Sequence, residues 1–167
     1  MEKKLLEIVY QKYHREIYLY LYSFCRNHHL TEDLLQETFL KAILSLPNTH
    51  SNIRAWLYMV ARNLYLNYRK KNEKNQLLED VDNLSDTACE NDVFDGIFKD
   101  EKRRLLYTLI QELEDRTKEV IIMQYFGGMS QKEIAAVLRI TPENVRVLSY
   151  RGKKRLKERL EESGYEV

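Results

Sequence analysis

Turn-forming residues, cysteines and long apolar runs are all scarce in this sequence. Its 167 residues include only two prolines and five glycines, too few for the many turns of an all-β sandwich. No run approaches the roughly 18 apolar residues of a membrane span, and the amino-terminal stretch is amphipathic, unlike a signal peptide. The two cysteines, Cys25 and Cys89, give no disulfide framework, so we expect reduced thiols and a soluble, cytoplasmic protein.

The usual sequence signatures of catalysis are missing as well. The chain has no glycine-rich phosphate loop, no HExxH pair and no Ser, His and Asp arrangement of a hydrolase. Cys25, His28 and His29 lie close together, but no second cluster completes a tetrahedral metal site. A buried cysteine beside two surface histidines is the simpler interpretation. We therefore predict no enzyme activity, no metal, no cofactor and no small-molecule substrate.

Charge is distributed unevenly along the chain. Hydrophobic residues make up 44% and charged residues 32%, which favours helices when glycine is rare. Residues 1–72 hold 11 basic and 6 acidic side chains, residues 73–102 hold 3 and 10, and residues 103–167 hold 13 and 10. The acidic stretch is either solvated surface or a tether between domains. We predict an all-α protein with one small helical domain over 1–72, a flexible acidic linker over 73–101 and a second domain over 102–167.

The first basic segment has apolar residues at helical spacing in two successive helices. Thr31 is the predicted N-cap of the second helix, with carboxylates in its first turn. Asp33, Gln36 and Glu37 are expected to face solvent. Pro47 ends this helix, and residues 47–52 are predicted to form an exposed polar loop. The predicted apolar positions are Leu5, Ile8, Val9, Tyr13, Ile17, Leu21 and Phe24 in the first helix, and Leu34, Leu35, Thr38, Phe39 and Ala42 in the second.

The third predicted helix, over residues 53–71, carries a basic and aromatic face. Arginines and tyrosines recur along it at steps of three or four residues, and no acidic residue occurs between Asn52 and Asn72. Guanidinium groups bind phosphates and tyrosine rings stack on unpaired bases, so this face suits single-stranded nucleic acid. Trp56 is better explained by packing than by base stacking. The basic face comprises Arg54, Tyr58, Arg62, Tyr65 and Arg69, and the opposite core side comprises Ile53, Leu57, Val60 and Leu64.

The second basic segment is organised around a short helix, a tight turn and a longer helix. Helices are predicted over 102–113 and 117–126, and Ser130 with Glu133 then forms a capping box. Arg139 and Ile140 make the turn, after which Thr141 caps the last helix. This is the spacing of a helix-turn-helix. The inward positions of its short helix are Ile134, Ala135 and Leu138, and Pro142 occupies the first position of the long one.

The last helix is strongly basic. Residues 139–159 contain eight basic and two acidic side chains. A basic helix that follows a tight turn suits the major groove of DNA, where it neutralises phosphates and presents its first side chains to the bases. A solvated basic helix without a ligand is the alternative interpretation.

Two blocks of sequence resemble a known family. The first half resembles region 2 of bacterial sigma factors in the segments TEDLLQETFLKA and IRAWLYMVARNLYLNYRKK. The second half resembles region 4 in the segment YFGGMSQKEIAAVLRITPENVRVLSYRGKKRLKE. The likeness covers residues 5–71 and 103–160, and the acidic linker in place of a middle domain matches the extracytoplasmic-function group. It implies a protein that binds the beta and beta-prime subunits of core RNA polymerase, recognises and opens promoter DNA, and has an anti-sigma factor able to hold it at the membrane.

The resemblance also implies roles for individual residues. Docking on the polymerase is implied for Asp33, Leu34, Gln36 and Glu37. Contacts with the minus-ten element are implied for Asn48, His50, Ser51, Asn52, Arg54, Trp56, Tyr58, Arg62, Asn63, Tyr65 and Arg69. Contacts with the minus-thirty-five element are implied for Ser130, Gln131, Thr141, Glu143, Asn144, Arg146, Val147, Tyr150, Arg151 and Lys154.

The chain departs from the family pattern in several places. Arg139 replaces the usual glycine, so the turn must be made without a residue that accepts a positive φ freely. The other departures are Leu113-Glu114 for Leu-Pro, Asn67 for an aspartate, and Val147-Leu148-Ser149-Tyr150 for a small-basic-leucine pattern.

Two alternative functions are weaker. A self-standing helix-turn-helix regulator leaves the basic and aromatic helix unexplained, and a helical metal-dependent hydrolase lacks enough ligands.

Overall fold

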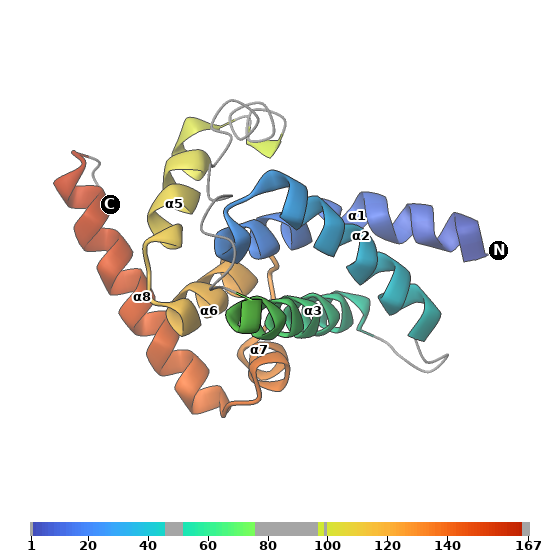
Figure 1. The fold of residues 1–167 in the computed structure, drawn as a ribbon. Coiled ribbons are helices and arrows are strands. Elements are labelled where there is room, and N and C mark those ends of the chain that lie inside the picture. Colours follow the sequence, from blue (N-terminus) through green and yellow to red (C-terminus); the bar gives the residue numbers. More distant parts are fainter. Residues whose placement is uncertain (1, 46–51, 76–96, 99, 165–167) are drawn as a thin grey trace. The chain divides into compact units, whose positions relative to one another are not determined.

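Helices are the only regular elements in the computed structural model, which describes residues 2–45, 52–75, 97–98 and 100–164 (Figure 1). Two units form, Met1–Val93 and Phe94–Val167, and the all-α prediction is confirmed. No described helix is long and apolar enough to cross a bilayer. The first unit holds α1 (Glu2–Cys25), α2 (His28–Ser45) and α3 (Ile53–Asn75), and the second holds α5 (Glu101–Gln111), α6 (Asp115–Tyr125), α7 (Gln131–Leu138) and α8 (Pro142–Glu162).

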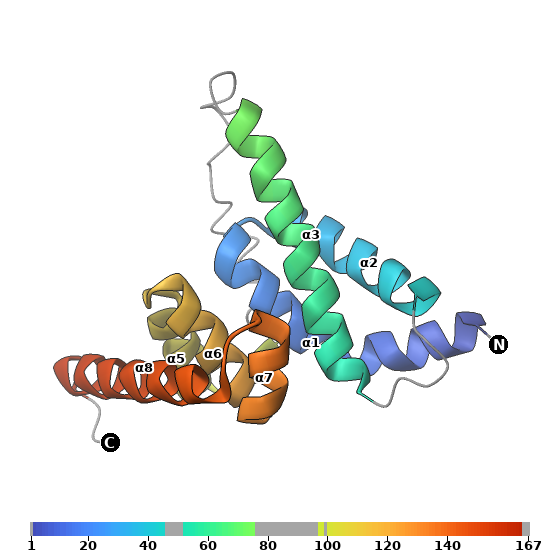
Figure 2. The same ribbon diagram turned by 90° about the horizontal axis from the view of Figure 1, so that it is seen from below.

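The first unit is a bundle in which α3 packs against both α1 and α2 (Figure 2). Aromatic side chains join the helices: the ring centroids of Tyr10 and Phe39 lie 5.0 Å apart, and those of Tyr20 and Tyr58 lie 5.1 Å apart. The predicted apolar side of α2 is buried throughout. Predicted core positions that are in fact exposed are Leu5 and Ile8. Leu5 continues the stripe of Val9, Tyr13 and Ile17 into the first turns of α1, whereas Ile8 lies on another side of the helix.

The start of α2 differs from the prediction. The helix begins at His28, and the side-chain oxygen of Asn27 accepts a hydrogen bond from the backbone N–H of Leu30 at 3.0 Å, as a cap does. Thr31 lies inside the helix, where it is buried and donates its hydroxyl hydrogen to the Asn27 carbonyl at 2.7 Å. The prediction of a Thr31 cap is therefore wrong. A positive φ of 50° at Arg26 turns the chain between α1 and α2, which places Asn27 at the cap.

The second unit is built around α8, which packs against α5, α6 and α7. α8 approaches α6 closely at Gly152, where an added Cβ would lie 2.7 Å from Cγ1 of Ile121. An aromatic cluster covers the other end of the core. The rings of Phe98, Tyr107 and Phe126 lie 5.6–6.1 Å from one another.

The helix-turn-helix forms as predicted. The capping box is present, with Ser130 and Glu133 each accepting a hydrogen bond at 3.2 Å from the other's backbone N–H. Thr141 caps α8 by accepting from the N–H of Asn144 at 3.1 Å, with Pro142 in the first turn. Between the two helices, Arg139 adopts a left-handed conformation with φ 58° and ψ 44°. An L-residue therefore makes the turn for which glycine is better suited.

Candidate polymerase and nucleic-acid interfaces

One side of α2 is a polar surface. Asp33, Gln36 and Glu37 are exposed, as predicted, and Glu37 makes only a surface ion pair of 3.8 Å with Lys41. Leu34 was expected to dock with them, but its side chain is 5% exposed and belongs to the core. Successive helical residues point about 100° apart, so Leu34 follows the buried side while Asp33 follows the exposed one. Its assignment to a docking surface is corrected accordingly.

Sequence reasoning missed two leucines on this surface. Leu40 is 53% exposed and Leu44 is 79% exposed, and both share the helical phase of Asp33. An apolar hollow of about 380 Å³ lies beside them between α1 and α2, with Tyr10 and Gln36 in its wall. The sequence could have indicated both leucines, because they follow Asp33 by seven and eleven residues, and these spacings return to the same face of a helix. We call the set Asp33, Gln36, Glu37, Leu40 and Leu44 the α2 docking row.

The first turn of α3 is held in place by three polar contacts. Asn52 accepts a hydrogen bond from the N–H of Ala55 at 3.0 Å and so caps the helix. Arg54 pairs with Glu16 of α1, with Nε and Oε1 3.0 Å apart. Trp56 donates its indole N–H to the Ala42 carbonyl at 3.3 Å. The packing interpretation of Trp56 fits this contact, and Asn52 and Arg54 also position the helix.

Tyr58 lies in the core and not on the exposed basic face. Its side chain is fully buried, and among the described residues its hydroxyl lies near the Glu16 carboxylate without a hydrogen bond of regular geometry. Burial, with the Glu16 carboxylate nearby, raises the pKa of Tyr58 well above its ordinary value. Burial also raises the pKa of Glu16, although the Arg54 guanidinium acts in the opposite direction. The expected stacking of Tyr58 on a base is therefore corrected, because α3 packs against two helices and its buried arc includes this position.

The remaining basic and aromatic face of α3 is shorter than predicted. Asn63 and Arg69 are exposed, and Arg69 makes a surface ion pair of 3.4 Å with Glu73. Arg62 is half-buried, as is Tyr65, whose ring centroid lies 5.2 Å from that of Phe24. The predicted minus-ten residues Asn48, His50 and Ser51 lie outside the described residues.

The segment Cys25–His29 has local partners. The hydroxyl of Tyr18 and Nδ1 of His28 lie 2.9 Å apart, which accounts for one histidine. Burial raises the pKa of Cys25 to about 11, with a hydrogen bond to Thr31 acting in the opposite direction. This thiol is protonated at neutral pH and supplies no thiolate for nucleophilic chemistry.

The first half of α8 exposes most of the side chains predicted to meet the minus-thirty-five element. Ser130 and Thr141 are exposed too, but their hydroxyls serve as helix caps. The side chains of α8 that share the core with α6 are Val145 and Ser149, and Ser149 donates to Gln124 at 2.6 Å. The exposed predicted residues are Gln131, Glu143, Asn144, Arg146, Val147, Tyr150, Arg151 and Lys154.

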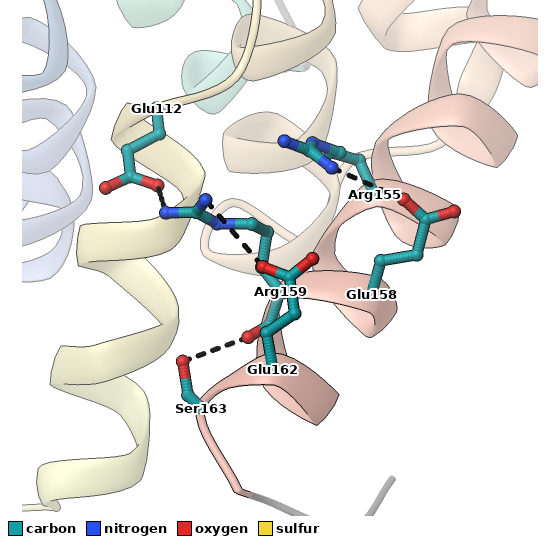
Figure 3. Close-up of polar contacts among 6 residues, drawn as sticks. All are labelled: Glu112, Arg155, Glu158, Arg159, Glu162 and Ser163. Carbon is teal, nitrogen blue, oxygen red and sulfur yellow. Dashed lines mark hydrogen bonds and ion pairs between the residues drawn. The ribbon is translucent and has the colours of Figure 1, made fainter.

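Two arginines in the second half of α8 are neutralised by carboxylates. Arg159 forms ion pairs with Glu112 at the end of α5 and with Glu162, and Arg155 lies 3.4 Å from Glu158 (Figure 3). The other basic residues of α8 make no ion pair within the described part of the chain. Phosphate-binding capacity is thus concentrated in five side chains: Arg146, Arg151, Lys153, Lys154 and Lys157.

Comparisons with known proteins agree with this division. Residues 9–75 match the family described as Sigma-70 region 2, and residues 103–156 match Sigma-70, region 4. The chain is 31% identical over 153 residues to the ECF RNA polymerase sigma factor SigM of Bacillus subtilis, covering 91% of this chain and 93% of that protein. It is 32% identical over 163 residues to the RNA polymerase sigma factor YlaC of the same organism, covering 95% and 93%.

A solved structure shares the fold. It is the sigma factor RpoE of Bartonella quintana, crystallised with the anti-sigma factor NepR, with a TM-score of 0.68 and 21% identity over 95% of this chain and 98% of that one. The region 2 match falls on the first unit, and the region 4 match falls on the second. The chain therefore belongs to the extracytoplasmic-function group of sigma-70 factors, which bind core RNA polymerase and direct promoter-specific transcription initiation.

Proposed function

We propose that the two units divide promoter recognition between them. The α2 docking row binds core RNA polymerase, α3 and the loop before it hold the opened strand of the minus-ten element, and the first half of α8 reads the minus-thirty-five duplex. The observation that carries the proposal is the set of five cations, unpaired within the described residues, on the helix that follows the capped turn of the helix-turn-helix: Arg146, Arg151, Lys153, Lys154 and Lys157. Phosphate binding there fixes the register in which neighbouring side chains meet the bases.

The domain boundaries remain part of the proposal. Residues 1–72 form the docking and minus-ten domain, 73–101 the acidic linker and 102–167 the minus-thirty-five domain, although α3 continues to Asn75. Linking two weak binding sites makes the second contact intramolecular and raises the overall affinity. Each unit alone should therefore bind its promoter element weakly.

Charge reversal tests the docking row. Replacing Asp33 and Glu37 by lysine should abolish assembly with core polymerase, because both carboxylates are exposed on the proposed contact surface. Thermal stability should stay nearly unchanged, since exposed substitutions away from special contacts alter it by only about 0.5 kcal/mol. Glu161→Lys is the matched control, an exposed carboxylate of α8 outside the proposed surface. Normal assembly of the double variant would show that α2 does not dock on the polymerase.

Salt dependence tests the duplex contact. Arg146→Ala or Arg151→Ala should weaken holoenzyme binding to promoter DNA and reduce the slope of log affinity against log salt by about 0.9, the value of one phosphate. Arg155→Ala is the control, because its guanidinium is already paired with Glu158 and should leave the slope unchanged. An unchanged slope in all three variants would show that α8 does not hold phosphates through these arginines.

A pre-melted template tests the strand contact. Arg62→Ala or Tyr65→Ala should slow opening on every promoter and stay weak on a bubble template, since a lost stacking contact costs about 1–3 kcal/mol. Alanine at Asn48, His50 and Ser51 should instead lower discrimination between bubble sequences. The control is Lys71→Ala, an exposed charge on another side of α3. If the Arg62 and Tyr65 variants bind the bubble normally, this face does not contact the strand.

We also propose an anti-sigma factor as a partner and the cytoplasm as the place of action. The fold is shared with a sigma factor crystallised with its anti-sigma factor. The second unit offers an apolar groove of about 560 Å³, lined by Leu106, Ile110 and Leu156, that a protein partner would cover. A membrane-anchored anti-sigma factor would also hold the chain at the membrane. Co-purification of the tagged chain with a protein that blocks assembly with core polymerase tests the proposal.

A further inference from the structure

Two apolar side chains are exposed in the first half of α8, between Arg146 and Arg151. Val147 is 43% exposed and Tyr150 is 67% exposed. They lie three residues apart and share one face of the helix with Glu143 and Lys154. We call Glu143, Val147, Tyr150 and Lys154 the outer row of α8.

The core of the second unit does not need these two residues. The buried side of α8 consists of Val145, Ser149, Gly152 and Leu156, and the outer row follows the opposite side. Arginines lie beside the row, at Arg146 and Arg151, and both are exposed. Val147 and Tyr150 therefore contribute apolar surface at the centre of a cationic face, where a purely electrostatic phosphate contact would gain nothing from it.

The major groove of DNA offers one apolar group to such a surface. Among the four bases only thymine presents a methyl group there, while the others present hydrogen-bond donors and acceptors. A valine or an aromatic ring that covers this methyl group removes apolar surface from water, which is favourable. At the other bases the same side chain displaces water from hydrogen-bonding groups and offers no hydrogen bond in its place. Charged neighbours bind phosphates without regard to sequence.

From this arrangement we infer that Val147 and Tyr150 are specificity-determining residues that select thymine in the minus-thirty-five element through its 5-methyl group. The inference rests on the proposed placement of α8 in that duplex. Three residues of helix advance about 4.5 Å along the axis, close to the 3.4 Å rise of a base pair. With α8 lying along the groove, the two side chains reach methyl groups on neighbouring base pairs.

Deoxyuridine tests the inference directly, because it removes only the methyl group from thymine. Holoenzyme assembled from the full chain first selects its promoter from a randomised library. Each thymine of the upstream element is then replaced in turn by deoxyuridine, and the affinity is measured. Replacement at one or two neighbouring positions should weaken binding about fourfold each, the equivalent of about 0.8 kcal/mol for one buried methyl group.

Variants assign each methyl group to its reader. Val147→Ala should bind thymine and deoxyuridine templates equally at one position, and Tyr150→Ala should do so at the neighbouring one. Alanine has the higher helix propensity, so neither variant loses affinity by unfolding α8. Tyr150→Phe should retain the fourfold preference, because the ring and not the hydroxyl makes the contact.

Two controls separate this inference from the function on which it rests. Arg151→Ala should weaken binding to thymine and deoxyuridine templates by the same factor, whereas Arg155→Ala should resemble the unaltered chain. Equal binding of thymine and deoxyuridine at every upstream position, with tight holoenzyme binding intact, would overturn the inference alone. A holoenzyme indifferent to all upstream substitutions would instead overturn the placement of α8 on the duplex.

Discussion

Arg139 holds a backbone conformation that favours glycine, and replacing it should stabilise the second unit. It ends α7 with φ 58° and ψ 44°, and its side chain is exposed. The left-handed conformation costs an L-residue about 1–2 kcal/mol. Glycine avoids this cost but gains about 0.4–1 kcal/mol of extra chain entropy in the unfolded state. The midpoints of these two ranges differ by about 0.8 kcal/mol, so Arg139→Gly should raise the free energy of unfolding by roughly 0.5–1 kcal/mol.

The matched control is Arg139→Ala, which removes the same charge but keeps the Cβ atom. Thermal unfolding of the full chain, followed by circular dichroism, compares the two variants. Because 1 kcal/mol shifts Tm by about 4–8 °C in a domain of this size, the glycine variant should unfold roughly 2–8 °C above the alanine variant. Trp56 is the single tryptophan and lies in the first unit, so its fluorescence transition should not move.

Equal stability of the glycine and alanine variants would refute the reasoning. It would mean that the surrounding structure, and not the Cβ atom, determines the energy of this turn. A glycine variant that is less stable than alanine would lead to the same conclusion more strongly.

Three further predictions concern the two cores. Gly152→Val should lower the free energy of unfolding by about 1–3 kcal/mol through overpacking, and Ile121→Ala should partly rescue it, as chemical denaturation of the single and double variants will show. Tyr58→Phe should leave stability nearly unchanged, since its buried hydroxyl lies near the Glu16 carboxylate without a regular hydrogen bond, whereas Tyr58→Ala should cost about 3–5 kcal/mol. The pKa of Glu16 is raised in the fold above its ordinary 4.5, so the folded protein holds this proton more tightly than the unfolded chain does. The free energy of unfolding should therefore fall as pH rises from 4.5 to the raised pKa. Glu16→Gln should lack this contribution in unfolding curves measured over the same pH range.

Local signals predicted the second unit well. The Ser130 capping box, the Thr141 cap and the turn at Arg139 were all correct, because each depends on residues within four positions of one another. The phase of α2 was also correct for its buried positions and for Asp33. A cap depends on neighbouring residues, and a helix with one buried face shows that face in its apolar spacing, so tertiary packing altered neither prediction.

Tertiary packing decided where prediction failed. The steps of three and four residues through Tyr58 fit an exposed face, but contact with two helices widened the buried arc of α3 to include it. Arg54 fits a phosphate ligand until Glu16, 38 residues away in sequence, becomes its partner. Thr31 is a good cap by type, but Asn27 precedes it at the true turn. The partners of Tyr58 and Arg54 are distant in sequence and cannot be read from the spacing alone, whereas the Thr31 error is local and arose because the turn at Arg26 was not predicted.

The ion pairs at the end of α8 limit how many phosphates this helix can neutralise on bulk DNA. With Arg155 and Arg159 occupied, five cations give it a salt slope of at most about −4.5, so it contributes only modest sequence-independent affinity at physiological ionic strength. We therefore expect the chromosome to be a poor sink for the unbound protein, which leaves more of it in solution to encounter polymerase.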